Sequence, residues 1–412
     1  MIGRDDALML AERFGTPLYA YDLDDVETRC AELRGVLPAG ARLLYSLKAN
    51  PLPAVAAAAL GAGAGAEVSS EGELASALEA GFEPSSIVVT GPAKSDGLLE
   101  RAVDCGVGCF SAESWRDLDR IAAAAAAAAT TTRALLRLNG AGPPTARLAM
   151  TGVPSQFGFD EDDLALGLDR LEALANVDVV GIHTYCGTQL PDAEALTAAF
   201  RHGIELATSL AARIPIRVVN LGGGFPWPFA TDAPPIDLAP LAAAIARLDT
   251  SSPGGGELWF ESGRYVSASC GTLVSRVADV KRSRGTTYVV LDAGISHFGG
   301  MAGLGRVLRS SVSVLPAGPD RGGATMVADV VGPGCTPLDC LARGTELPEL
   351  EPGDLVRVPN VGAYGATASL SSFLSHPAAL EVSLRGGCVV DVARLRGGHE
   401  RAGATAVGHD GA

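Results

Sequence analysis

The chain has 412 residues, of which 47% are hydrophobic and 19% are charged. This length and balance are typical of a globular protein that holds a barrel of about 250 residues and a second domain. The formal net charge of −15 argues against nucleic acid or an anionic membrane as a partner, because both attract basic surfaces. No uninterrupted apolar run reaches the length of a membrane span, and the start MIGRDDALMLAERFG lacks the apolar core of a signal peptide. We therefore expect a cytoplasmic protein.

The eight cysteines and six histidines show no metal-binding pattern. Cys105 and Cys109 lack a second cysteine pair, and the histidines do not cluster. Reduced thiols and the absence of a metal are the expectation.

The first predicted elements are a strand at Thr16–Tyr21 and a helix at Leu23–Leu37. From Ala41 onward, strand-like and helix-like patterns alternate, and each of eight predicted strands is followed by a helix or a loop. The eight strands are Leu43–Leu47, Ala66–Ser69, Ile87–Thr90, Val107–Ser111, Ala134–Leu138, Val179–Thr184, Arg217–Leu221 and Leu258–Glu261. Eight such units predict a (β/α)8 barrel, an α/β fold with its functional residues at the carboxyl ends of the strands.

After Gly271 the pattern changes to short strands separated by Gly/Pro turns, which predicts a mostly β domain. Its predicted strands are Val274–Val280, Thr287–Leu291, Ser311–Leu315, Met326–Val331, Leu355–Val358 and Glu381–Leu384. The Gly/Ala-rich tail at 397–412 is predicted to be disordered.

Lys48 lies at the end of the first barrel strand, in the segment YSLKANP. If burial lowers its pKa, the amine becomes a nucleophile able to form a Schiff base; on position alone, a surface lysine at a strand–loop junction is the commoner explanation. The segment resembles the one that carries pyridoxal phosphate (PLP) in the fold-type III decarboxylases, the family of diaminopimelate and ornithine decarboxylases. The resemblance implies that Lys48 carries PLP.

Two further barrel segments extend this resemblance. Gly222, Gly223 and Gly224 follow the seventh strand, where bare backbone amides can hold a phosphate, although a simple turn explains the triplet equally well. The segment FESGRY resembles the family's acid–small–Gly–Arg motif. By that resemblance Glu261 pairs with the pyridine nitrogen, and Arg264 helps to hold the phosphate.

The sixth strand ends in GIHTYCGTQ, which looks like the family's His-x-His-Ile-Gly-Ser-Gln segment. The match puts Thr188 in the place of the phosphate-binding serine and assigns His183 to the substrate side of the site. Tyr185 replaces the histidine that stacks on the cofactor ring in the common decarboxylases. An aromatic ring can still stack there, so cofactor binding is still expected.

In the β domain, VGPGCTPLDCLA resembles the family's Gly-Pro-x-Cys-Glu-Ser-x-Asp segment, which enters the active site of the neighbouring subunit. The resemblance makes Cys335 the proton donor to the decarboxylated intermediate and matches Asp339 to the later aspartate. Thr336 stands where the family has an acid that reads the distal amine of the substrate, so the charge partner of a second ammonium group is lost.

Two more segments of the β domain resemble the family. GAYG places Tyr364 at the position of the phosphate-contacting tyrosine. SSFLSHP stands where the common enzymes have a Ser-Asn-Tyr-Asn-x-Arg-Pro type of segment, from which Leu374 and His376 depart, and by this place His376 is assigned to the substrate. The implied organisation is alanine racemase/decarboxylase-like: an N-terminal strand at 1–25 that joins the β domain, a PLP-binding barrel at 26–270, and the β domain at 271–396. A homodimer with shared active sites is also implied.

Tyr185, Thr336 and the SFLSHP segment resemble the subgroup that decarboxylates glutamyl or methylaspartyl groups on an acyl carrier protein in natural-product biosynthesis. Arg306 and Arg309 are candidates for a cationic entrance, with a solvated surface role as the alternative. Three other functions are weighed: a decarboxylase of free diaminopimelate, lysine or ornithine; an amino-acid racemase, against which the Cys335 segment argues; and a catalytically dead regulatory homologue.

Overall fold

The computed structural model describes residues 2–139, 148–149, 154–249, 255–298, 312–318 and 323–396. The predicted tail at 397–412, Arg306 and Arg309 lie outside these residues. Among the described residues, no helix has both the length and the apolar composition needed to span a lipid bilayer.

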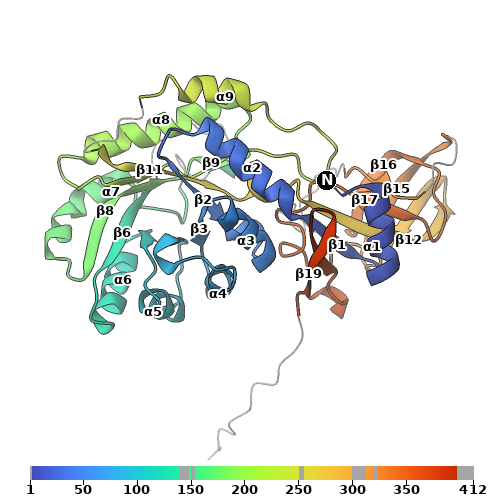
Figure 1. Ribbon diagram of the computed structural model, residues 1–412, viewed down its shortest axis with the longest axis horizontal. Helices are drawn as coiled ribbons and strands as arrows, with labels where there is room; N and C mark the ends of the chain where they lie inside the picture. Colours follow the sequence, from blue (N-terminus) through green and yellow to red (C-terminus); the bar gives the residue numbers. More distant parts are fainter. Residues whose placement is uncertain are drawn as a thin grey trace, which may run out of the picture.

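Eight parallel strands close into a barrel in the order β10-β11-β2-β3-β4-β5-β6-β8 (Figure 1). Their bounds are β2 Arg42–Ser46, β3 Gly65–Val68, β4 Ile87–Val89, β5 Cys109–Ala112, β6 Thr132–Leu138, β8 Val177–Thr184, β10 Val218–Asn220 and β11 Glu257–Ser262. All eight are the strands predicted from sequence, displaced by at most two residues at either end. The barrel prediction is confirmed.

Helices surround the barrel, and several begin at a serine that satisfies a free backbone N–H. Ser70, Ser95 and Ser114 each accept a hydrogen bond from the backbone N–H three residues further on. The helices are α2 Leu23–Val36, α3 Pro53–Gly61, α4 Glu71–Glu79, α5 Asp96–Asp104, α6 Trp115–Ala127, α7 Glu161–Gly167, α8 Ala193–Leu210, α9 Leu238–Ile245 and α10 Arg264–Ser267. A short antiparallel pair, β7 (Leu148–Ala149) with β9 (Gly187–Thr188), lies outside the barrel sheet.

The interior of the barrel is filled in two layers. The lower layer is a separate apolar cluster made of Leu44, Val88, Cys109, Leu135, Val180, Val218 and Trp259. Because side chains alternate across a strand, the residue two positions further on faces the same interior. There the buried side chains are polar: Ser46, Thr90, Ser111, Arg137, Asn220 and Glu261. Glu67 of β3 and His183 of β8 complete this layer; His183 lies three positions after Val180, where the pairing of β6 with β8 shifts register. This polar layer lies at the carboxyl ends of the strands, where barrel proteins build their sites.

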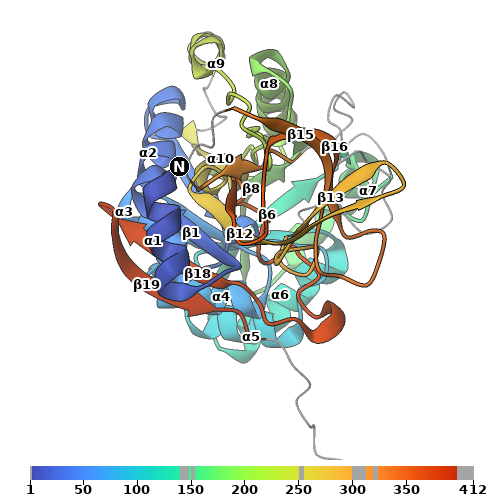
Figure 2. The same ribbon diagram turned by 90° about the vertical axis from the view of Figure 1, so that its right-hand side faces the viewer.

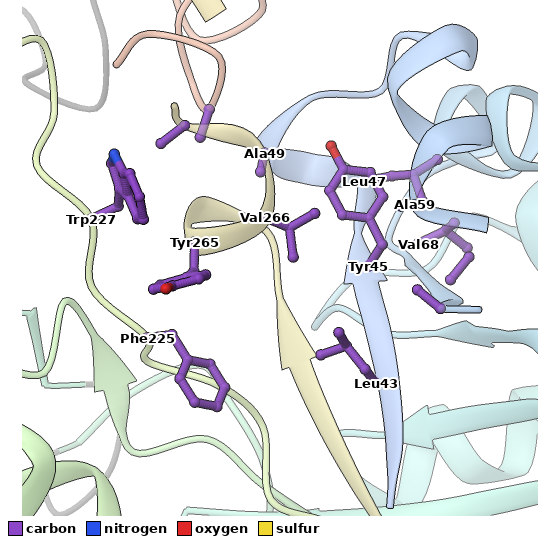
Figure 3. Close-up of a cluster of buried hydrophobic side chains, with 14 of the residues drawn as sticks. Leu43, Tyr45, Leu47, Ala49, Ala59, Val68, Phe225, Trp227, Tyr265 and Val266 are labelled. Carbon is purple, nitrogen blue, oxygen red and sulfur yellow. The ribbon is translucent and has the colours of Figure 1, made fainter. Parts of the chain in front are cut away.

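The outer faces of the same strands are apolar and pack on the helices. Figure 3 shows Leu43 and Tyr45 of β2 in one buried cluster with Val266 of α10. The hydroxyl of Tyr45 donates a hydrogen bond to the backbone oxygen of Asn50 at 2.8 Å, so this outer packing also holds the loop after β2.

The β domain is a nine-stranded sheet with the main order β16-β15-β13-β12-β1-β18-β19. The bounds are β1 Leu18–Asp22, β12 Gly271–Ser283, β13 Thr286–Leu291, β14 Leu315–Pro316, β15 Thr325–Val331, β16 Cys340–Pro348, β17 Leu355–Val358, β18 Leu380–Arg385 and β19 Cys388–Arg394. Strand β1 lies between β12 and β18, so an N-terminal segment is part of this sheet. Figure 2 shows β1, β18 and β19 at one side of the domain and β15 and β16 at the other.

Three elements of this domain were not predicted, and one was predicted too long. Helix α1 (Arg4–Phe14) buries Ala7, Leu10 and Ala11, but the exposed apolar residues Leu8 and Met9 lie between them and hide the helical pattern. Strand β16 contains a glycine at position 344, and every residue of the edge strand β19 is at least partly exposed, so neither shows clear alternation. The strand predicted at Ser311–Leu315 is reduced among the described residues to the two residues of β14.

Candidate active site

A cavity of about 790 Å³ lies above the polar layer of the barrel and is closed on one side by the loop at 364–368 of the β domain. Among its lining side chains are seven residues singled out in the sequence: Lys48, His183, Tyr185, Thr188, Glu261, Arg264 and Tyr364. The fold therefore brings together residues that lie more than 300 positions apart in the chain.

Lys48 sits in a short 3-10 turn, Leu47–Ala49, directly after β2. Contacts from the β domain fix this turn: the backbone N–H of Tyr364 donates to the oxygen of Ala49 at 2.7 Å, and Nδ2 of Asn50 donates to the oxygen of Gly362 at 2.9 Å. The position of the lysine thus depends on both domains.

The amine of Lys48 is paired with Glu67, which lies 2.5 Å away and is almost completely buried. Burial alone would lower the pKa of Lys48, but the charges of Glu67 and then Glu261 outweigh burial, and the pKa is raised. The condition considered for Lys48, a pKa lowered by burial, is therefore not met in the cofactor-free site. The physical reason is Glu67, whose own pKa is lowered: burial would raise it, but Lys48 and hydrogen bonds from Ser46 and Thr90 prevail.

Glu261 lies near the end of β11, in the same polar layer of the barrel as Glu67. Its Oε1 accepts a hydrogen bond from Nδ2 of Asn220 at 2.8 Å and lies 3.3 Å from Nε2 of His183. Burial, followed by the charge of Glu67, raises the pKa of Glu261 to about 7. Burial also keeps the pKa of His183 well below its usual value, so this ring is neutral and its contact with Glu261 is not an ion pair. The other ring nitrogen, Nδ1, is 2.8 Å from the hydroxyl of Ser111.

The glycine triplet after β10 is required by close packing. Gly222 has a φ of +64°, and an added Cβ would lie 2.5 Å from the oxygen of Thr184 and 2.8 Å from a ring carbon of Tyr185. A Cβ on Gly223 would lie 2.2 Å from the backbone oxygen of Glu261. The backbone is therefore brought close to Tyr185 and Glu261, where a side chain has no space.

Arg264, the first residue of α10, has its guanidinium carbon 4.7 Å from the ring centre of Tyr364. Its Nε is buried and has no hydrogen-bond partner among the described residues. A buried guanidinium donor without an acceptor marks the place where an anionic ligand is expected.

Several cavity residues were missed in the sequence. Besides Glu67, these include Arg137, whose Nη1 donates to Glu113 at 2.8 Å and whose guanidinium lies 4.8 Å from the ring of Phe157. Glu113 also accepts the backbone N–H of Gly158 at 2.8 Å, which joins the arginine to the loop over the cavity. The available signal was a charged residue at an inward position near the end of a predicted strand, as in GAEV and RALLRL.

Seven predicted site residues are not among those that line this cavity: the glycine triplet Gly222, Gly223 and Gly224, and, in the β domain, Cys335, Thr336, Asp339 and His376. Cys335 is exposed, and Thr336 and Asp339 line a different hollow in the β domain. The carboxylate of Asp339 accepts backbone N–H groups of Ile295 at 2.9 Å and Gly334 at 2.6 Å, so it shapes the loop that carries Cys335. His376 lies beside His297, with 5.9 Å between ring centres.

The eight cysteines are all free. Among the described residues, no group of three or more His, Cys, Asp or Glu side chains is placed to hold a metal ion.

The comparisons with known proteins agree on one family. A family model described as pyridoxal-dependent decarboxylase, pyridoxal binding domain, matches residues 23–268. The chain is 35% identical to L-glutamyl-[BtrI acyl-carrier protein] decarboxylase of Niallia circulans, over 92% of this chain and 91% of that protein. It is 33% identical to diaminopimelate decarboxylase of Deinococcus radiodurans, over 90% and 91% of the two chains. The structure of diaminopimelate decarboxylase of Helicobacter pylori with L-lysine superposes with a TM-score of 0.83 at 27% identity, covering 94% of this chain and 95% of that one.

The comparisons show PLP to be the cofactor, and the cavity fits it. Arg264 offers an unpartnered buried donor, the glycine triplet leaves backbone bare, and Lys48 supplies an amine. Glu261 supplies an acid for the pyridine nitrogen, and Tyr185 an aromatic face. We propose these residues as the cofactor site, with Thr188 and Tyr364 beside the phosphate.

The first prediction concerns the covalent link. The chain has only three lysines, Lys48, Lys94 and Lys281, and of these only Lys48 lines the cavity. Borohydride reduction of the purified holoenzyme followed by peptide mapping should place the cofactor on Lys48 alone. Lys48→Ala should abolish the adduct. An adduct on Lys94 or Lys281 in the wild-type protein would refute the assignment.

The second prediction concerns Glu261 in the cofactor-free protein. Because its pKa is raised from 4.5 to about 7, ionising it costs stability as the pH rises through that interval. Glu261→Gln should therefore gain stability relative to wild type between pH 5 and pH 8, by roughly 1–3 kcal/mol. Denaturant unfolding at both pH values measures this, with Glu79→Gln on the exposed face of α4 as the control. If the difference in unfolding free energy between Glu261→Gln and wild type does not change with pH, the raised pKa of Glu261 is contradicted.

Proposed function

The chain belongs to the fold-type III PLP-dependent decarboxylases, and on this premise we propose that it removes the α-carboxylate of an acidic amino acid carried as a thioester by an acyl carrier protein. Glutamyl and methylaspartyl groups are the substrates of this type. The observation that carries the proposal is Thr336, which stands where the family's free diamino-acid enzymes place an acid.

PLP, when bound, supplies an electron sink for the electron pair left by the departing carboxylate. The residues of the chain prepare the site for this chemistry. Lys48 must lose a proton to act as a nucleophile, and in the cofactor-free site Oε2 of Glu67, at 2.5 Å, holds the amine in its charged form, because it raises the pKa of Lys48. Glu261, which accepts a hydrogen bond from Asn220 and lies 3.3 Å from Nε2 of His183, keeps an acid at the floor of the cavity.

The substrate argument is one of charge. A diamino acid brings a distal ammonium group into the closed site, and this charge needs a carboxylate partner. Thr336 offers only a hydroxyl, which already accepts the backbone N–H of Leu338 at 3.3 Å. A neutral thioester has no such requirement. The 35% identity to a relative named for a glutamyl-carrier substrate supports the same conclusion.

We propose in addition that the active site is shared between two subunits of a homodimer. Cys335 is exposed in the β domain, whereas Lys48 lines the cavity of the barrel. A second copy of the chain would bring Cys335 to this cavity as the proton donor, and Thr336 and His376 to the substrate.

The third prediction compares substrates directly. Carbon dioxide release from L-glutamyl or methylaspartyl groups on the BtrI carrier should exceed release from free diaminopimelate, lysine, ornithine or glutamate. An unpaired ammonium costs about 1–3 kcal/mol, or roughly ten- to a hundredfold in kcat/KM. Thr336→Glu should shift the ratio toward the diamino acids, and Thr336→Ser is the matched control. Faster turnover of a free diamino acid by the wild-type enzyme would make it an ordinary basic amino-acid decarboxylase.

The fourth prediction tests the shared site. Lys48→Ala and Cys335→Ala should each be inactive as homodimers. Mixed in equal amounts, they should recover about a quarter of the wild-type activity, because half of the dimers are mixed and each mixed dimer has one intact site. Native mass spectrometry confirms that subunits have exchanged. Exchange without recovery would place both residues in one subunit's site.

A further inference from the structure

A second hollow, of about 390 Å³, lies in the β domain beside the loop that carries Cys335. Its floor is one face of the sheet, where Lys281 pairs across the strands with Tyr288, and Tyr288 with Asp329. The loop at 332–339 forms a wall, to which Thr336 belongs. This hollow is therefore continuous with the segment that we assign to the substrate.

Two cations line the hollow in a chain whose net charge is −15. Of the three lysines, Lys94 is buried in an ion pair with Asp117 at 2.5 Å and Lys48 is engaged in the barrel cavity, so Lys281 is the exposed lysine of the β domain. Among the described residues, Lys281 forms no ion pair. Its charge is available to a ligand.

Arg343 is the second cation, and its side chain is 61% exposed. Its guanidinium lies 3.6 Å from Asp329, which also accepts the backbone N–H of Gly344 at 2.7 Å, so the arginine is oriented without being fully neutralised. The other acid in the hollow, Asp339, is occupied by backbone N–H groups. The hollow thus contains two cationic side chains, Lys281 and Arg343, whereas both of its carboxylates accept hydrogen bonds from backbone N–H groups.

We propose that this hollow binds the phosphodiester of the carrier's phosphopantetheine arm, with Lys281 and Arg343 on the phosphate oxygens. Lysine acts as a point charge and arginine as a fork, a pair suited to phosphate. The neutral part of the arm lies along Val290 and Val331 and leads the thioester toward Cys335. This inference rests on the proposed function and adds the place where the carrier's arm is recognised.

The strand itself provides a matched control. Arg282 is as exposed as Lys281 but lies at the next position of β12, so its side chain belongs to the opposite face. Lys281→Glu and Arg282→Glu make the same change of net charge on neighbouring residues. Only the first changes the charge inside the hollow.

The experiment measures kcat/KM of the holoenzyme for two small substrates, L-glutamyl-4′-phosphopantetheine and L-glutamyl-pantetheine, which differ only in the phosphate. Wild type should prefer the phosphorylated substrate by about tenfold. Lys281→Glu and Arg343→Glu should lose the preference through a raised KM, whereas Arg282→Glu should keep it. In calorimetric titration with 4′-phosphopantetheine, Lys281→Glu and Arg343→Glu should have a higher Kd than wild type, and Arg282→Glu should not. Thermal unfolding checks that each variant is folded.

Each contrary result has a distinct meaning. Equal loss of preference in Lys281→Glu and Arg282→Glu would show general attraction rather than a site, and retention of the preference in Lys281→Glu would place the phosphate elsewhere. Either outcome overturns this inference. The proposed function still stands in both cases if the glutamyl substrates are turned over. If wild type turns over neither small substrate nor the loaded BtrI carrier, the proposed function itself fails, and the inference with it.

Discussion

Closure of the barrel is the constraint on which the rest of the structure depends. Eight strands meet around one axis, and side-chain alternation sends one residue near the end of each strand into a common interior. An apolar layer that includes Trp259 and Leu44 fills the space below, so the polar residues above it have no access to solvent except through the cavity. Glu67 and Glu261 are held together on this floor although they lie on β3 and β11, far apart in sequence.

The electrostatics of the site follow from that enclosure. Two buried carboxylates, Glu67 and Glu261, act on the charge of Lys48, and only Glu67 forms an ion pair with it. Glu67 contacts the amine of Lys48 and receives hydrogen bonds, so its pKa is lowered, whereas the pKa of Glu261 is raised by burial and by the charge of Glu67. The polar layer thus contains an ionised carboxylate beside the amine, Glu67, and a carboxyl group whose pKa is about 7, Glu261. A PLP site requires this division of roles.

The sequence predicts the barrel because its strands are apolar runs at regular spacing, and it predicts the cavity residues because whole segments such as YSLKANP and FESGRY resemble one family. It does not predict Glu67, since one glutamate in a short strand of small residues shows nothing of the lysine that it meets at the end of the neighbouring strand β2. For the same reason the sequence does not show that the charge of Glu67 outweighs burial and raises the pKa of Lys48. Strands β16 and β19 were missed because glycine and exposure remove their alternation.

The central claim is that the barrel of one subunit and the Cys335 loop of its partner share one active site, because this sharing determines which residues meet the substrate. Loop 364–368 closes the barrel cavity within one subunit, whereas the loop that carries Cys335 remains on the outside. A crystal structure of the holoenzyme tests this most directly. We predict a dimer in which electron density joins the cofactor to Lys48, with Cys335 of the partner subunit lining the same cavity. A cofactor bound elsewhere, or Cys335 facing solvent in every subunit of the assembly, would contradict the account.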